Sequence, residues 1–207
     1  MAAGVDTVTP LTTQAQATAV KNAGKTFIMR YYKDNGYPQL TQSEAQLISA
    51  AGLKVGVVFE TDPSGIGYFT ASKGKSDALA AMNQARSIGQ PADSVIYFAI
   101  DFNASPTQAT GAIKTYFQAV FDEFNYLISS LGYPYILIGV YGDGAVCSEI
   151  KDSSGLAQYS WLGGAASYHG NSTYTNWNLK QSATTTTIDG INYDLDQSSG
   201  AFGGFTV

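Results

Sequence analysis

The stretch SVIYFAIDFNAS, residues 94–105, is a run of branched and aromatic side chains that leads directly into Asp101. No charged residue interrupts it between Val95 and Ile100. A continuous apolar strand is covered on both faces, as in a parallel sheet with helices packed outside, whereas strict alternation marks a sheet with one face in water. We therefore expect a buried parallel strand that ends on a carboxylate.

Comparable apolar runs recur along the chain, with helical patterns between them. Strands are expected at residues 4–8, 25–32, 53–60, 94–101, 135–142, 159–164, 176–182 and 192–198. Helices are expected at residues 11–23, 40–52, 72–89, 107–131 and 145–150. Thr41 and Glu44 have the spacing of a capping box, and Gly52 is a typical helix end. Beyond residue 150 the strand candidates follow one another with little helix between them.

This alternation of strands and helices predicts an α/β fold. The first strand is not followed by a glycine-rich dinucleotide fingerprint, which favours a closed (β/α)8 TIM-like barrel over a dinucleotide-binding fold. We expect the barrel to be small, with missing helices in its last third. Neither an internal repeat nor a linker divides the chain, so residues 1–207 are expected to form a single domain.

The composition restricts the partners. A formal net charge of −5 and a sequence pI near 4.6 argue against nucleic acid or an anionic membrane surface as a partner. No apolar run approaches the ~18 residues of a membrane span. The start lacks the charged and apolar segments of a signal peptide, so any export signal is expected to have been removed. The many Ser, Thr, Gly, Asn and Tyr residues indicate a secreted or cell-envelope protein, expected to be a monomer.

Polar residues collect near the carboxyl ends of the expected strands, where barrel enzymes carry their active sites. Residues two apart on a strand share a face, which groups Asp101 with Asn103 and Arg30 with Tyr32. An unpaired charge facing the helix layer would cost several kcal/mol, so we expect these side chains to face the barrel mouth. The full set is Asp6, Arg30, Tyr32, Glu60, Asp101, Asn103, Tyr141, Trp161, Gln181, Asp194 and Asp196.

Carboxylates, aromatic rings and amides in one mouth match glycoside hydrolysis. One acid protonates the leaving oxygen, another acts as nucleophile or base, and aromatic faces stack on sugar rings. Acids that repel one another leave at least one with a raised pKa, available as a proton donor. The chain has a single histidine and no metal-ligand spacing, so neither a metal nor a cofactor is expected.

Structural roles remain open for the same residues. Asp101 is also explained as a strand-end cap or as a salt-bridge partner of Arg30. Asp194 and Asp196, with Asp189 nearby, are a candidate Ca²⁺ site, and the aromatic residues are candidates for core packing. A catalytic pair of Cys147 and His169 is disfavoured, because Cys147 lies in an apolar helical stretch where a buried, inert thiol is usual.

Six segments carry a resemblance that spans essentially the whole chain in order: GVDTVTP, TFIMRYY, GLKVGVVFETD, YFAIDFNAS, IGVYGDG and KQSATTTTIDGINYDLDQ. The chain resembles a bacterial glycoside-hydrolase-like family of TIM barrels, found in secreted cell-envelope proteins and related to the family-25 muramidases. The muramidase site acids are a first-strand Asp, an Asp-x-Glu pair after strand four and an Asp near the end of strand eight. The resemblance puts these on Asp6, on Asp101, and on Asp194 or Asp196, but Asn103 stands where the pair has Glu.

The sequence therefore leaves two main alternatives for the function. In the first, the chain hydrolyses peptidoglycan or a related polysaccharide, with Glu60 as general acid/base, Asp101 as nucleophile or stabiliser, and Asp6 and Asp194 assisting. Substrate contacts would come from Arg30, Tyr32, Asn103, Tyr141, Trp161, Gln181 and Asp196. In the second, which Asn103 would permit, the barrel is catalytically impaired and only binds cell-wall glycan. A scaffold or interaction domain is a third, weaker alternative.

Overall fold

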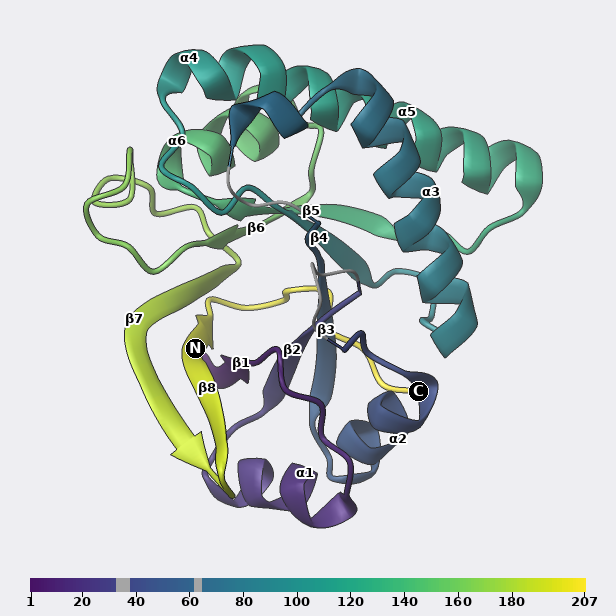
Figure 1. Ribbon diagram of the computed structural model, residues 1–207, viewed down its shortest axis with the longest axis vertical. Coiled ribbons are helices and arrows are strands. Elements are labelled where there is room, and N and C mark those ends of the chain that lie inside the picture. Colours follow the sequence, from purple (N-terminus) through teal and green to yellow (C-terminus); the bar gives the residue numbers. More distant parts are fainter. Residues whose placement is uncertain (33–37, 62–64) are drawn as a thin grey trace.

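The computed structural model describes residues 1–32, 38–61 and 65–207, whose eight strands close into a barrel in chain order (Figure 1). Each neighbouring pair from β1–β2 to β6–β7 is parallel. The eight-stranded TIM-like α/β barrel is thus confirmed. The strands are β1 (Ala2–Asp6), β2 (Phe27–Tyr31), β3 (Lys54–Phe59), β4 (Val95–Ala99), β5 (Leu137–Gly142), β6 (Tyr159–Leu162), β7 (Leu179–Ile188) and β8 (Ile191–Ser198).

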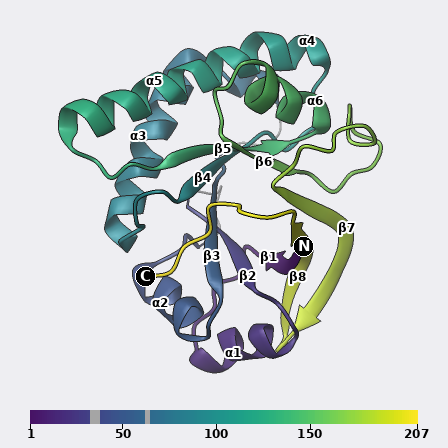
Figure 2. The ribbon, with the colours of Figure 1, turned by 180° about the vertical axis from the view of Figure 1, so that it is seen from behind.

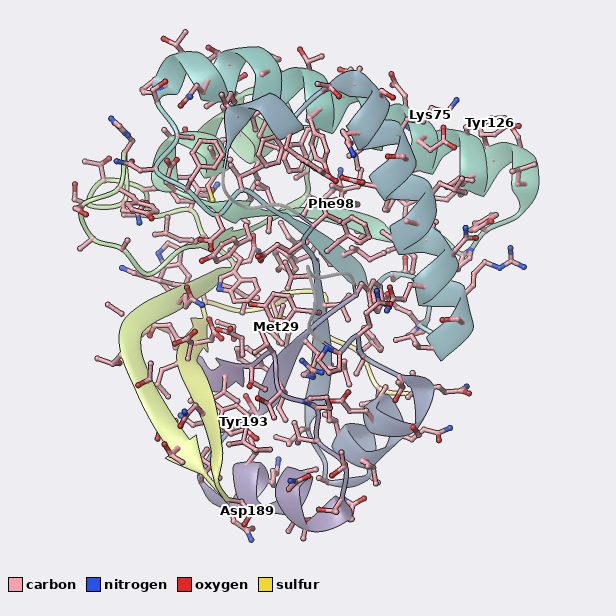
Figure 3. The ribbon with its side chains drawn as sticks, viewed as in Figure 1. Met29, Lys75, Phe98, Tyr126, Asp189 and Tyr193 are labelled. Atoms are coloured by element: carbon pink, nitrogen blue, oxygen red, sulfur yellow. The ribbon has the colours of Figure 1, made fainter. Side chains whose placement is uncertain are left out.

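The last strand departs from the (β/α)8 pattern. β8 runs antiparallel to both β7 and β1. The cause is local: Asp189 and Gly190, at φ 49° and 75°, form a two-residue turn with both residues left-handed, which is the turn that joins antiparallel strands most tightly. Strand β7 is longer than expected and includes the threonine tract. Asp189 marks the tip of this hairpin, beside α1 in the view of Figure 3.

The helices cover only part of the barrel wall. Figures 1 and 2 show α3 to α6 over β4 and β5 on one side and α1 and α2 on another, while the β7–β8 hairpin carries no helix. Missing helices in the last third are therefore observed. None of the helices in the described part of the chain is both long and apolar enough to span a membrane. The helices are α1 (Gln14–Asn22), α2 (Gln42–Ala50), α3 (Ala71–Ile88), α4 (Pro106–Gln108), α5 (Lys114–Leu131) and α6 (Gly144–Cys147).

Strand parity divides the core into two layers. On β4, Ile96 and Phe98 pack outward against the helices, whereas Val95, Tyr97 and Ala99 fill the barrel interior. The carboxyl-terminal segment closes the interior, because Phe202 packs against Phe27 and its carbonyl accepts a 2.9 Å hydrogen bond from the hydroxyl of Tyr97. The interior below the mouth is thus filled by side chains.

Candidate active site

The carboxyl-end mouth of the barrel holds a cavity of about 200 Å³. Each strand from β2 to β8, or the loop that follows it, contributes one residue to the lining of this cavity. Parity explains the choice: Tyr31, Glu60 and Asp101 each come two residues after an inward core residue, namely Met29, Val58 and Ala99. The lining residues are Tyr31, Glu60, Asp101, Tyr141, Trp161, Gln181 and Asp194.

A second cavity of about 280 Å³ adjoins the first, and the two share Asp101, Tyr141, Gln181 and Asp194. It extends over Asp143 and the loop after β6, where Tyr168 lies. The two cavities form one elongated cleft, which we call the mouth cleft.

A chain of hydrogen bonds runs from the mouth cleft into the barrel. The hydroxyl of Tyr141 lies 3.3 Å from Oδ1 of Asp101 and 3.0 Å from Oε1 of Gln181. Nε2 of Gln181 in turn donates to Oδ2 of Asp6 at 2.8 Å. Because an amide donates only through its nitrogen, the Asp6 carboxylate fixes the orientation of Gln181 and leaves its oxygen for Tyr141.

Two buried acids lie at the inner end of this chain. Asp6 is 2 % exposed and Asp196 is 6 % exposed, and their carboxyl groups hydrogen-bond to each other. Oδ1 of Asp196 accepts from Nε1 of Trp161 at 3.0 Å, whereas Oδ2 has no N–H or O–H donor among the described residues. A proton on that oxygen, donated to Asp6, satisfies both acids.

Burial is the main cause of the raised pKa values in this cluster. It raises the pKa of Asp6 to about 6, with smaller contributions from the charges of Asp194 and Asp101, while the Gln181 hydrogen bond opposes the shift. Burial and then the charge of Asp6 raise the pKa of Asp196 well above its usual range. Both acids therefore hold a proton more readily than an exposed Asp does, and they titrate as a pair.

The pKa values of the acids at the cleft surface, Asp101 and Asp194, are also raised. Partial burial raises the pKa of Asp101, against an opposing hydrogen bond from Tyr141. Burial and then the charge of Asp101 raise the pKa of Asp194. Asp194 also lies directly opposite Asp6 in the β1–β8 register, where like charges repel. The mouth is thus a cluster of acids that favours bound protons and positive charge.

The aromatic residues of the mouth have different positions. Trp161 is 1 % exposed and forms the floor, while Tyr141 is half-buried in the wall and packs edge-on against it, with ring centroids 4.8 Å apart. Trp161 therefore positions Asp196 and offers little surface for stacking on a sugar. Tyr31 and Tyr168 also line the cleft and were missed in the sequence, although the parity of β2 indicates Tyr31.

The expected inward position of Arg30 and Tyr32 is wrong. Both face the helix layer, because the inward positions of β2 are Phe27, Met29 and Tyr31. Arg30 is fully buried, and its Nε donates to Oε1 of Glu44 at 2.7 Å. The hydroxyl of Tyr32 donates to Gln90. Neither side chain can touch a substrate in the cleft.

The Arg30 contact also changes the expected capping box. Oγ1 of Thr41 accepts the backbone N–H of Glu44 at 3.2 Å, but the Glu44 carboxylate turns to Arg30 and to the backbone N–H of Leu11. The proposed salt bridge between Arg30 and Asp101 is accordingly absent. Half of the capping box is formed.

Asn103 lines neither cavity of the mouth cleft. Its Oδ1 accepts the backbone N–H of His169 at 2.9 Å and lies 2.6 Å from the Nδ1 of the same residue. His169 is thus bound to Asn103, and the Cys147 thiol is buried, with its pKa raised by burial. The described residues contain no cluster of three or more His, Cys, Asp or Glu able to hold a metal.

Comparison with known proteins identifies the family. The model of the Rv2525c-like, glycoside hydrolase-like domain matches residues 18–203. The chain belongs to this family. A curated relative, the uncharacterized protein YbfG of Bacillus subtilis, is 31 % identical over 96 % of the chain, and the match covers 29 % of YbfG. The chain thus spans about a third of the length of the curated relatives it matches.

Solved structures share the fold. The Tat-secreted protein Rv2525c of Mycobacterium tuberculosis, crystallised with L-tartrate, superposes with a TM-score of 0.76 at 22 % identity over 98 % of both chains. A family 25 glycosyl hydrolase from Bacillus anthracis gives 0.61 at 11 % identity over 98 % of this chain and 94 % of its own. The autolysin LytC of Streptococcus pneumoniae, solved with a synthetic peptidoglycan ligand, gives 0.63 at 11 % identity over 94 % of this chain and 46 % of its own.

Proposed function

We propose that the chain hydrolyses glycosidic bonds of peptidoglycan or a related cell-wall polysaccharide, with Glu60 and Asp101 as the acting carboxyl pair. The observation that carries the proposal is that these two acids, from the loops after the adjacent strands β3 and β4, line one 200 Å³ cavity. Glycoside hydrolysis needs two carboxyl groups on either side of one bond.

The Tyr141 hydroxyl supports Asp101 as the proton donor. This hydroxyl has one proton and two neighbouring acceptors, and the shorter contact is to Gln181. When Tyr141 donates to Gln181, its contact with Asp101 is satisfied only if Asp101 carries a proton. The raised pKa of Asp101 agrees with this. Glu60 is then the nucleophile or base, which reverses the roles expected from the sequence.

The reaction follows from these roles. Asp101 gives its proton to the glycosidic oxygen while the bond from that oxygen to the anomeric carbon breaks. If the carboxyl groups are about 5.5 Å apart in the working complex, ionised Glu60 attacks that carbon, and a water deprotonated by Asp101 then displaces Glu60 and releases the sugar. If they are about 6.5–9.5 Å apart, Glu60 deprotonates a water, which attacks the carbon directly. Asp6 and Asp194 supply negative charge close to the positive charge that develops on the sugar ring.

The relatives support the substrate class and the location. A family 25 glycosyl hydrolase shares the barrel, and so does part of the autolysin LytC, which was solved in complex with a synthetic peptidoglycan ligand. The Tat-secreted Rv2525c supports a place outside the cytoplasm. A polysaccharide is the proposed partner of a monomeric, secreted or cell-envelope barrel.

One observation favours a second function, glycan binding without hydrolysis. The position of the muramidase acid is held by Asn103, which is bound to His169 and lies outside the mouth cleft. A barrel that relies on that position for its acid would bind a glycan but leave it intact.

Release of new reducing ends from purified peptidoglycan and from chitin-type oligosaccharides tests both functions. Wild type and Asp122→Asn, an exposed carboxylate on α5, are expected to release them. Glu60→Gln and Asp101→Asn are expected to release none above background. Binding of glycan by wild type without release would establish the second function, and neither binding nor release would reject both.

A further inference from the structure

A cavity of about 620 Å³, larger than either cavity of the mouth cleft, lies outside the barrel. It is lined by residues of β6, β7, β8 and β1 and of the loop that follows β6, and none of its lining residues lies in a helix. Its lining includes the outward residues Ala3, Leu162, Lys180, Leu195 and Gln197. We call this cavity the wall groove. The chain passes from β7 to β8 through a hairpin, so no helix lies between these two strands to cover the groove.

The wall groove adjoins the mouth cleft. The two share Gly163, Gly164, Gln181, Ser182 and Ala183, at the carboxyl end of β6 and in β7. Gly164 lies at this junction, where a Cβ would come within 2.9 Å of the Ser182 backbone. A group attached to a glycan in the mouth cleft can therefore extend over the rim into the wall groove.

The charge of the wall groove is opposite to that of the mouth cleft. Lys25 and Lys180 line it, both half-buried, and neither has a carboxylate within salt-bridge distance among the described residues. The one acidic residue in the lining, Asp196, turns its carboxyl group into the barrel toward Trp161 and Asp6. In a chain with a net charge of −5, two unpaired ammonium groups in one groove select an anion.

We infer that the wall groove binds the carboxylate-bearing peptide stem of a peptidoglycan strand whose sugars occupy the mouth cleft. The inference rests on the proposed glycan function and names the substrate more narrowly. A volume of 620 Å³ is within the range of about 300–1,000 Å³ for ligand sites. Uncharged chitin-type chains have no group that pairs with Lys25 and Lys180, whereas a stem peptide ends in carboxylates.

The test compares three ligands on protein carrying Glu60→Gln, which holds substrate without turnover. They are glycan oligomers with free-carboxylate stem peptides, the same oligomers with the carboxylates amidated, and oligomers stripped of peptide. Dissociation constants are measured by calorimetry at two salt concentrations. Lys25→Gln and Lys180→Gln are each expected to weaken binding of the free-carboxylate ligand about fivefold, and the double substitution tenfold or more.

The controls separate the groove from the rest of the surface. Lys54→Gln removes an exposed lysine outside the groove and is expected to change no affinity, while Lys180→Arg keeps the charge and is expected to retain binding. Amidated and stripped ligands should bind all variants alike. Equal affinity for all three ligands in the parent, with no effect of either lysine, overturns the inference and leaves the proposed function intact. Absence of binding to every ligand rejects both.

Discussion

At the scale of single residues, the hydrogen-bond chain from Asp101 through Tyr141 and Gln181 to Asp6 is the feature that gives the acids different roles. The Gln181 amide nitrogen donates to Asp6, whereas the single proton of the Tyr141 hydroxyl has two acceptors, Asp101 and Gln181. The chain ends on the buried Asp6–Asp196 pair, in which burial raises the pKa of both carboxyl groups. The acids of the mouth are thus one coupled unit.

The roles of Asp101 and Glu60 are separable by the leaving group. Asp101→Asn should lose activity on natural glycan by at least about 10²-fold, yet retain most activity on an aryl glycoside whose leaving group needs no proton. Glu60→Ala should lose activity on both substrates and regain it with azide if Glu60 is a nucleophile. Steady-state rates on the two substrates measure this. The opposite pattern would assign the acid to Glu60.

Arg30 is expected to act on stability and not on substrate. Arg30→Lys removes the fork that meets both oxygens of Glu44 in a fully buried site, and should lower the free energy of unfolding by about 2 kcal/mol. KM on glycan should be unchanged. Urea unfolding and steady-state kinetics check the two parts, and a raised KM with unchanged stability would return Arg30 to the binding site.

Among the secondary-structure elements, the sequence predicts the positions of β2 to β6 and β8 and the missing helices of the last third, but neither the full extent of β7 nor the antiparallel direction of β8. Buried parallel strands are continuous apolar runs, so β4 is recognisable from residues 94–101 alone, and parity then brings Glu60 and Asp101 together. Strand β7 is half exposed and rich in threonine, so it lacks the apolar run by which the other strands are recognised in the sequence. The Asp189–Gly190 turn was a readable signal for an antiparallel hairpin. The partner of Arg30 comes from another element, α2, and no local pattern reveals it.

The β7–β8 turn sets the position of Asp194 and Asp196. Gly190 has φ 75°, and a side chain there is strained. Gly190→Ala should lower the free energy of unfolding by about 1 kcal/mol, whereas Asp189→Gly, at φ 49°, should raise it slightly. Thermal unfolding of the two variants provides the comparison. Equal effects of the two substitutions would mean that the turn is not left-handed at both positions.

Over the whole molecule, the mouth acids make folding stability depend on pH. The pKa of Asp6 is about 6 in the folded chain and about 3.8 when unfolded. A raised pKa means that the folded state binds the proton more tightly, so this contribution to stability is full below pH 3.8 and is lost as pH rises through 6. The raised pKa values of Asp101, Asp194 and Asp196 act in the same direction.

Removing the charge of Asp6 should therefore stabilise the barrel at neutral pH. Asp6→Asn can still accept from Gln181, and it is expected to raise the free energy of unfolding at pH 7 by about 2–3 kcal/mol, with the gain vanishing near pH 4. Activity should fall, because the hydrogen-bond chain loses its anion. Urea unfolding between pH 4 and 7 measures the gain. A gain in the free energy of unfolding that does not change with pH would contradict the raised pKa of Asp6 as its cause.

The central claim is that this barrel hydrolyses a glycosidic bond. The most direct measurement is mass spectrometry of peptidoglycan fragments released in water enriched in oxygen-18. The account predicts fragments whose new reducing end carries one oxygen-18, formed by wild type and absent with Glu60→Gln. Intact peptidoglycan, or fragments with unlabelled anhydro ends, would contradict it.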